Sequence, residues 1–151
     1  MKAALAFVAT LALSTAMMAA NIPSGWKVVT DRAKTCQYAV PPDWTQDALF
    51  KSSSLSPDKK STAIVNGVKQ SMSEIKTNSN MVLTPDKVIE DSAKRYWYSY
   101  KNTLGGTPDS TNWYIAVPGN AGITCTAQVT FQDPGTDSLA RQIVDTIGPV
   151  K

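Results

Sequence analysis

The sequence contains no histidine, and this absence removes most of the common catalytic and metal-binding arrangements. A Ser-His-Asp triad and a Cys-His dyad both need the imidazole as a base, and most zinc sites use it as a ligand. Cysteine is scarce as well, because Cys36 and Cys125 are the two in the chain. If these two are paired, no thiolate nucleophile is left. We therefore assign no catalytic residue, no metal ligand and no cofactor from the sequence.

Long hydrophobic runs are missing too. An apolar stretch, AALAFVATLAL, covers residues 3–13 and is shorter than the roughly 20 residues that span a bilayer. It follows the basic Lys2 and precedes small residues that end at Ala20, an order typical of a secretory signal peptide. The sequence thus predicts a signal peptide over residues 1–20, cleaved before or after Ala20, and a single soluble domain over 21–151. Such a protein is exported to the bacterial periplasm or the extracellular space and has no stable membrane anchor.

A strong excess of one charge is also absent. The formal net charge is +3, and removing Lys2 with the signal peptide lowers it to +2. A nearly neutral chain gives no support for nucleic acid or an acidic membrane as the main partner. The partner that we expect is an unknown envelope or extracellular protein, or a small ligand.

In an exported protein, an even pair of cysteines indicates a disulfide. Cys36 and Cys125 both fall on the apolar side of alternating segments, so both are expected to face the core. This placement favours a Cys36–Cys125 bond. The alternative, two buried free thiols, stays open at this point.

The remaining pattern predicts an α+β fold. Thr84 and Pro85 are typical of a helix start, so we expect a helix over 84–102, whereas residues 70–82 are predicted to form a loop. A second helix is predicted over 137–147. Alternating apolar residues predict strands over 26–30, 35–40, 48–53, 62–69, 100–104, 112–117 and 123–131. Because strands and helices do not alternate strictly, we expect an antiparallel sheet of about six or seven strands with two main helices.

The aromatic run Tyr96-Trp97-Tyr98 is the candidate binding surface. On the expected helix, Trp97 faces the core and Tyr96 lies near the margin of the buried stripe. Tyr98 should point outward beside Lys94 and Arg95, and an exposed tyrosine next to cations can contact a protein or a sugar. The plainer interpretation, core packing or a single exposed tyrosine, remains open as well.

Several segments resemble the PsbP-like family, which includes extrinsic photosystem proteins, a nuclear-transport accessory protein and small bacterial envelope proteins. The resemblance is carried by YAVPPDW near the start, SPDKKSTAIV between two strands, the long helix beginning TPDKVIED, and a final strand with a helix, together spanning about residues 26–147. It implies a non-enzymatic binding or assembly factor. Since the chain has no histidine, no metal site and no photosynthetic role are carried over.

The sequence therefore predicts an exported, non-catalytic binding or assembly domain of unknown ligand. An inhibitor of a foreign enzyme fits the same features. The alternative is a small exported hydrolase that uses carboxylates such as Asp133 and Asp137, or a Ser-Lys pair such as that in SPDKKS. This alternative predicts a deep pocket that brings together at least two titratable groups with shifted pKa values.

Overall fold

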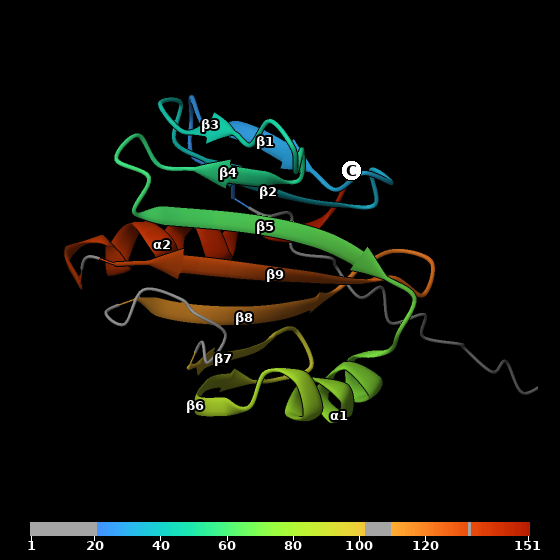
Figure 1. The fold of residues 1–151 in the computed structure, drawn as a ribbon. Coiled ribbons are helices and arrows are strands. Elements are labelled where there is room, and N and C mark those ends of the chain that lie inside the picture. The colour runs from blue at the N-terminus through green and yellow to red at the C-terminus, as the bar shows by residue number, and fades with distance from the viewer. Residues whose placement is uncertain (1–20, 102–109, 133) are drawn as a thin grey trace, which may run out of the picture.

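The computed structural model describes residues 21–101, 110–132 and 134–151 (Figure 1). The predicted signal peptide over 1–20, the end of the predicted strand over 100–104, and Asp133 lie outside these residues. The described part is dominated by a large antiparallel sheet. In spatial order, its strands are β3 (Thr45–Gln46), β4 (Ser53–Leu55), β5 (Ser61–Val68), β9 (Thr124–Phe131), β8 (Thr111–Pro118), β7 (Tyr96–Tyr100) and β6 (Pro85–Asp91).

One face of this sheet carries the main core. The helix α2 (Asp137–Asp145), preceded by a short 3-10 turn (Pro134–Thr136), packs there together with a small second sheet. The second sheet has the order β1 (Lys27–Thr30), β2 (Cys36–Val40) and β10 (Gly148–Pro149). The alternation predicted for 123–131 is confirmed, because the apolar side chains of β9 point into this core. The α+β class with an antiparallel sheet is therefore confirmed.

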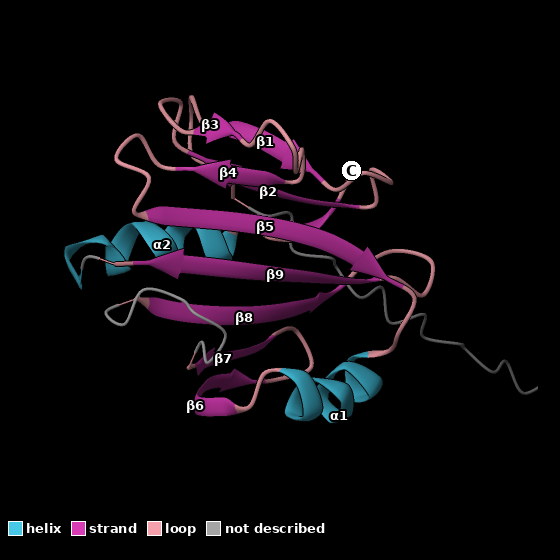
Figure 2. Cartoon of the chain, in the orientation of Figure 1, coloured by secondary structure: helices cyan, strands magenta, loops and turns pink. Residues whose placement is uncertain are grey.

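The other face is covered by the helix α1 (Met72–Val82) near β6 and β7 (Figure 2). Ile75 of α1 packs there against the tyrosines of β7 and against Ala116 of β8. The sheet is thus covered on both faces, and side chains from both sets of alternating positions are buried. No helix in the described ranges is long and apolar enough to cross a membrane.

The disulfide between Cys36 of β2 and Cys125 of β9 joins the two sheets. Both residues are fully buried, and their sulfur atoms lie 2.01 Å apart. The bond connects residues separated by 89 positions, and loop-closure entropy gives it about 4–5 kcal/mol of stabilisation. The predicted pairing is confirmed.

The first helix is not where we expected it. The segment predicted as a helix over 84–102 forms the hairpin of β6 and β7 as far as Tyr100, and the predicted loop over 70–82 contains α1. The helix α1 begins with a capping box, in which Ser71 N donates to Glu74 Oε2 at 2.7 Å and Glu74 N donates to Ser71 Oγ at 3.2 Å. The strand predicted over 48–53 is also wrong. Most of those residues form the turn between the short strands β3 and β4.

Candidate functional site

The tyrosines of the predicted binding surface lie inside the protein. Successive side chains of a strand point to opposite faces, so Tyr96 and Tyr98 of β7 share the face that α1 covers, and Trp97 enters the main core. Tyr98 is 0% exposed, so the expectation that it points outward is wrong. Its ring lies 5.2 Å from that of Tyr96 and stacks at 5.2 Å on Tyr114. These aromatic residues pack the fold together.

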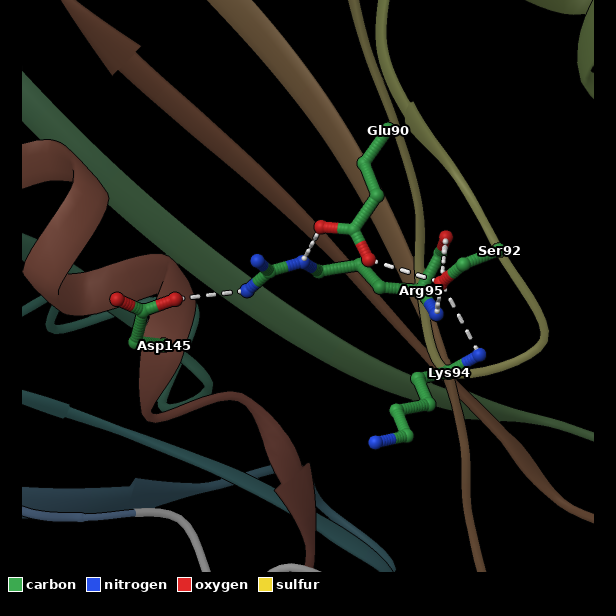
Figure 3. Close-up of polar contacts among 5 residues, drawn as sticks. All are labelled: Glu90, Ser92, Lys94, Arg95 and Asp145. Carbon is green, nitrogen blue, oxygen red and sulfur yellow. Dashed lines mark hydrogen bonds and ion pairs between the residues drawn. The ribbon is translucent and has the colours of Figure 1, made fainter.

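The cations of the predicted surface lie in the turn between β6 and β7, which is built around Ser92 (Figure 3). The Ser92 hydroxyl donates to Glu90 Oε1 at 2.8 Å. It also accepts from the backbone N–H groups of Lys94 at 3.2 Å and Arg95 at 3.1 Å. A serine that satisfies neighbouring backbone groups in this way stabilises a tight turn. Lys94 is exposed on this turn.

Arg95 joins this turn to α2. Its Nε donates to Glu90 Oε2 at 2.7 Å, and its Nη1 donates to Asp145 Oδ1 at 2.8 Å (Figure 3). Burial alone would lower the pKa of Arg95, but the hydrogen bonds to Asp145 and Glu90 outweigh it and raise that pKa. Burial alone would raise the pKa of Glu90, but the hydrogen bonds from Arg95 and Ser92 outweigh it and lower that pKa. An anionic ligand could bind Arg95 only by displacing Glu90 or Asp145. The contacts of Arg95 are therefore those of a structural clamp between the turn and α2.

A second arginine completes this region from the side of α2. Arg141 is paired with Asp137 at 2.8 Å, and its guanidinium lies 5.2 Å from the ring centre of Trp97 and 5.3 Å from that of Trp113. Arg95 also lies over Trp97, at 5.2 Å. Such cation–π contacts cover the indole rings where the core meets the solvent.

The groups considered for a hydrolase have local structural partners. In SPDKKS, the Ser56 hydroxyl donates to Asp58 at 2.6 Å and accepts from the Ser61 N–H at 2.9 Å, which closes the turn between β4 and β5. Asp137 is held by Arg141, and Asp133 lies outside the described residues. A cavity of about 10 Å³ between α2 and the large sheet, lined by Trp44, Phe131, Ile143 and others, has room for about one water. Among the described residues, no three cysteines or carboxylates cluster as metal ligands.

A surface that the sequence reasoning missed lies in the turn between β3 and β4, which we call the apolar turn (residues 47–52). Leu49 is 85% exposed and Phe50 is 63% exposed. The Asp47 carboxylate accepts from the backbone N–H groups of Leu49 at 2.7 Å and Phe50 at 3.0 Å. These bonds hold the pKa of Asp47 below its usual range, so the carboxylate stays ionised near neutral pH. An aspartate two residues before an apolar pair is the sequence signal that could have revealed this turn.

The apolar turn is closed at its base by backbone hydrogen bonds. Ser53 N donates to Phe50 O at 2.8 Å, and Asp47 N donates to Ser53 O at 2.9 Å. The two exposed side chains are therefore presented by a backbone that is hydrogen-bonded on both sides of the turn.

A buried carboxylate fixes the neighbouring loop between β1 and β2. Asp31 Oδ1 accepts from Thr35 N at 2.7 Å and Cys36 N at 3.0 Å. Its Oδ2 accepts from Thr35 Oγ1 at 2.9 Å and Gly67 N at 3.2 Å. Burial alone would raise the pKa of Asp31, but the hydrogen bonds from Cys36, Thr35 and Gly67 outweigh it and lower that pKa. Asp31 thus ties this loop to β5.

Comparison with known proteins shows likeness at the level of the fold. No family model matches the chain, and no curated protein matches its sequence. The fold is similar to a crystal structure from Bacteroides thetaiotaomicron, with a TM-score of 0.55 and 17% identity over 85% of this chain. This chain spans 50% of that protein's length. A solution structure of cyanobacterial PsbP (CyanoP) from Synechocystis aligns with a TM-score of 0.47 and 10% identity over 84% of this chain and 94% of that one.

Proposed function

We propose that this protein is an exported, non-catalytic binding or assembly domain that contacts its partner through the apolar turn. The observation that carries the proposal is the exposure of Leu49 and Phe50 side by side on a turn held by hydrogen bonds. The disulfide and the predicted signal peptide support export. The resemblance to the PsbP-like family supports a binding or assembly role.

The energetics of the apolar turn suit a contact site. Removing a leucine or phenylalanine side chain from water stabilises a complex by about 1.5–3 kcal/mol each. Because Asp47 and Ser53 already hold the backbone of the turn by hydrogen bonds, binding costs little additional backbone entropy. A few well-packed residues near the centre of an interface commonly supply most of its binding energy, so two side chains can be enough to form a contact site.

The experiment is capture of the partner from a detergent-free envelope extract with affinity-tagged protein, followed by assay of both protein and lipid in the captured material. Leu49 and Phe50 are replaced together by serine. The matched control is Val88→Ser on β6, because Val88 is also exposed, at 49%. The wild type and the control should capture the same component, and the Leu49→Ser/Phe50→Ser protein should lose it.

Two results would contradict the proposal. One is equal loss of the component in the control and in the double variant. The other is the absence of any component above the level of a tag-only sample.

A further inference from the structure

The described cations are unevenly distributed over the molecule, although its net charge is small. We define the basic end by the four segments that contribute to it, which are residues 31–35, 47–52, 66–69 and 150–151. These segments carry five exposed cations, Arg32, Lys34, Lys51, Lys69 and Lys151. They carry two side-chain carboxylates, Asp31, which is buried, and Asp47, which is partly buried. The nearly neutral total therefore conceals an excess of exposed cations in the segments of the basic end, one of which is the apolar turn.

Hydrogen bonds bring these segments together at the C-terminal end of β5. Val65 N donates to Ser52 O at 3.2 Å, which places the apolar turn beside this end of the strand. Two residues further along, Gly67 N donates to Asp31 and binds the β1–β2 loop. Val150 N donates to Thr35 O at 3.0 Å and adds the last residues of the chain. Figure 1 shows these segments at the same end of the molecule.

We infer that the basic end docks on an anionic lipid bilayer, with Leu49 and Phe50 entering the interfacial layer and the cations lying at the headgroups. The inference rests on the proposed function and names the partner of the same turn. It departs from the expectation, drawn from net charge alone, that an acidic membrane is not the main partner, and the vesicle experiment below tests the two against each other.

A lipid surface fits this end better than a protein groove does, for two reasons. First, the apolar pair stands on a projecting turn with most of its surface in solvent, so it can enter a fluid layer without a partner of matching shape. Second, a bilayer places anionic groups directly around an apolar layer. The basic end has both kinds of group, because its segments carry exposed cations as well as the exposed pair Leu49 and Phe50. Two side chains anchor weakly, so the docking is reversible.

The fold-changes expected for single substitutions follow from these contacts. A cation near an anionic surface strengthens binding about fivefold, and burial of a phenylalanine side chain strengthens it about tenfold or more. Phe50→Ser and Lys51→Gln should therefore weaken binding by about these factors. Added salt should weaken the contribution of the cations further, because it screens exposed charges.

The test is flotation of the purified protein, in the processed and oxidised form that the cell exports, with vesicles of known composition. One set is phosphatidylcholine alone, and the other is an equimolar mixture with phosphatidylglycerol. Val88→Ser is the control for Phe50→Ser. Lys60→Gln is the control for Lys51→Gln, because it removes the same charge at the opposite end of β4. We expect salt-sensitive binding to the anionic vesicles that the two basic-end variants weaken and the two controls keep.

Several results would overturn the inference. They are equal binding to neutral and anionic vesicles, equal effects of the variants and their controls, or no binding at low salt. If vesicles fail to bind but the envelope capture recovers a protein that depends on Leu49 and Phe50, the lipid inference is wrong and the proposed function stands. If both experiments fail, the proposed function is wrong as well.

Discussion

Replacing Asp31 by asparagine removes part of the hydrogen bonding of its carboxylate, which accepts four hydrogen bonds, three from Thr35 and Cys36 and one from Gly67 of β5. The amide keeps one oxygen, which can accept from Thr35 N and Cys36 N as Asp31 Oδ1 does at 2.7 and 3.0 Å. The NH₂ group then faces the Gly67 N–H, which had donated to Oδ2 at 3.2 Å. If the amide is turned by 180°, its oxygen can accept from Gly67 N, but Thr35 N and Cys36 N then lose their acceptor. Because a hydrogen bond to a charged group contributes about 1.5–3 kcal/mol, we expect a loss of about 3 kcal/mol of stability.

The effect of Asp31→Asn should depend on pH with a definite sign. Burial alone would raise the pKa of Asp31, but the hydrogen bonds that its carboxylate accepts lower it in the folded protein. A lowered folded-state pKa contributes stability that is fully present above the unfolded-state pKa of about 3.9. That contribution is lost as the pH falls through the folded-state pKa. Since asparagine does not titrate, the difference between wild type and variant should be largest near neutral pH and shrink in acid.

The assay is urea unfolding of both oxidised proteins, followed by tryptophan fluorescence at neutral pH and at several acidic values. Subtracting the unfolding free energy of the variant from that of the wild type removes the contribution of the other carboxylates, because both proteins share it. Asp43→Asn is the matched control, because Asp43 is exposed, and it should change stability by no more than about 0.5 kcal/mol. The reasoning fails if Asp31→Asn behaves like this control, or if the difference between wild type and variant is the same at all pH values.

Three further predictions concern stability. The Cys36→Ser/Cys125→Ser protein lacks the disulfide, which joins residues 89 positions apart, and should lose about 4–5 kcal/mol of unfolding free energy. Detection of two reactive thiols in the native wild type would contradict this prediction. Gly67→Ala makes its new Cβ clash with Thr35 Oγ1 of the β1–β2 loop and should lower the free energy of unfolding by about 1–3 kcal/mol, whereas the Cβ of Gly148→Ala meets nothing within 4 Å and should have little effect. Arg95→Ala should cost about 1–3 kcal/mol in urea unfolding because the partly buried carboxylate of Glu90 loses its cation and keeps only the hydrogen bond from Ser92, and an unchanged midpoint would show that the clamp does not act.

Strands with regular alternation were predictable from the sequence, and so was the disulfide. In β9, every second residue from Cys125 to Phe131 is apolar, and this face meets the main core whatever its partner is. The two cysteines lay on core-facing positions of two such strands, so their pairing followed from the alternation together with the expected export.

The segment 84–102 shows where local signals fail. Thr84, Pro85 and Asp86 are typical of a helix start, but the run YWYSY has the period of two that belongs to a strand. Burial decides between the two patterns, because the tyrosine face is covered by α1 and the face of Trp97 by the main core. This burial depends on segments distant in the chain. The capping box at Ser71 and Glu74 was present in the sequence and would have placed α1 correctly.

The candidate site was less predictable than the fold. Of the four residues expected at a binding surface, Tyr96 and Tyr98 are core residues, Arg95 is a clamp, and Lys94 is exposed. The apolar turn was missed because apolar residues are ordinarily expected to be buried. The charge of the basic end comes from segments that only the folded chain brings together, so net charge could not reveal it.

Cross-linking inside the living cell tests the central claim most directly. A photoreactive amino acid is placed at position 50, and the control is the same amino acid at position 88, which is also exposed. If the apolar turn is the contact surface, irradiation should give an adduct with one envelope component, protein or lipid, at position 50 and not at position 88. Equal adducts at both positions, or an adduct at position 88 alone, would contradict the account.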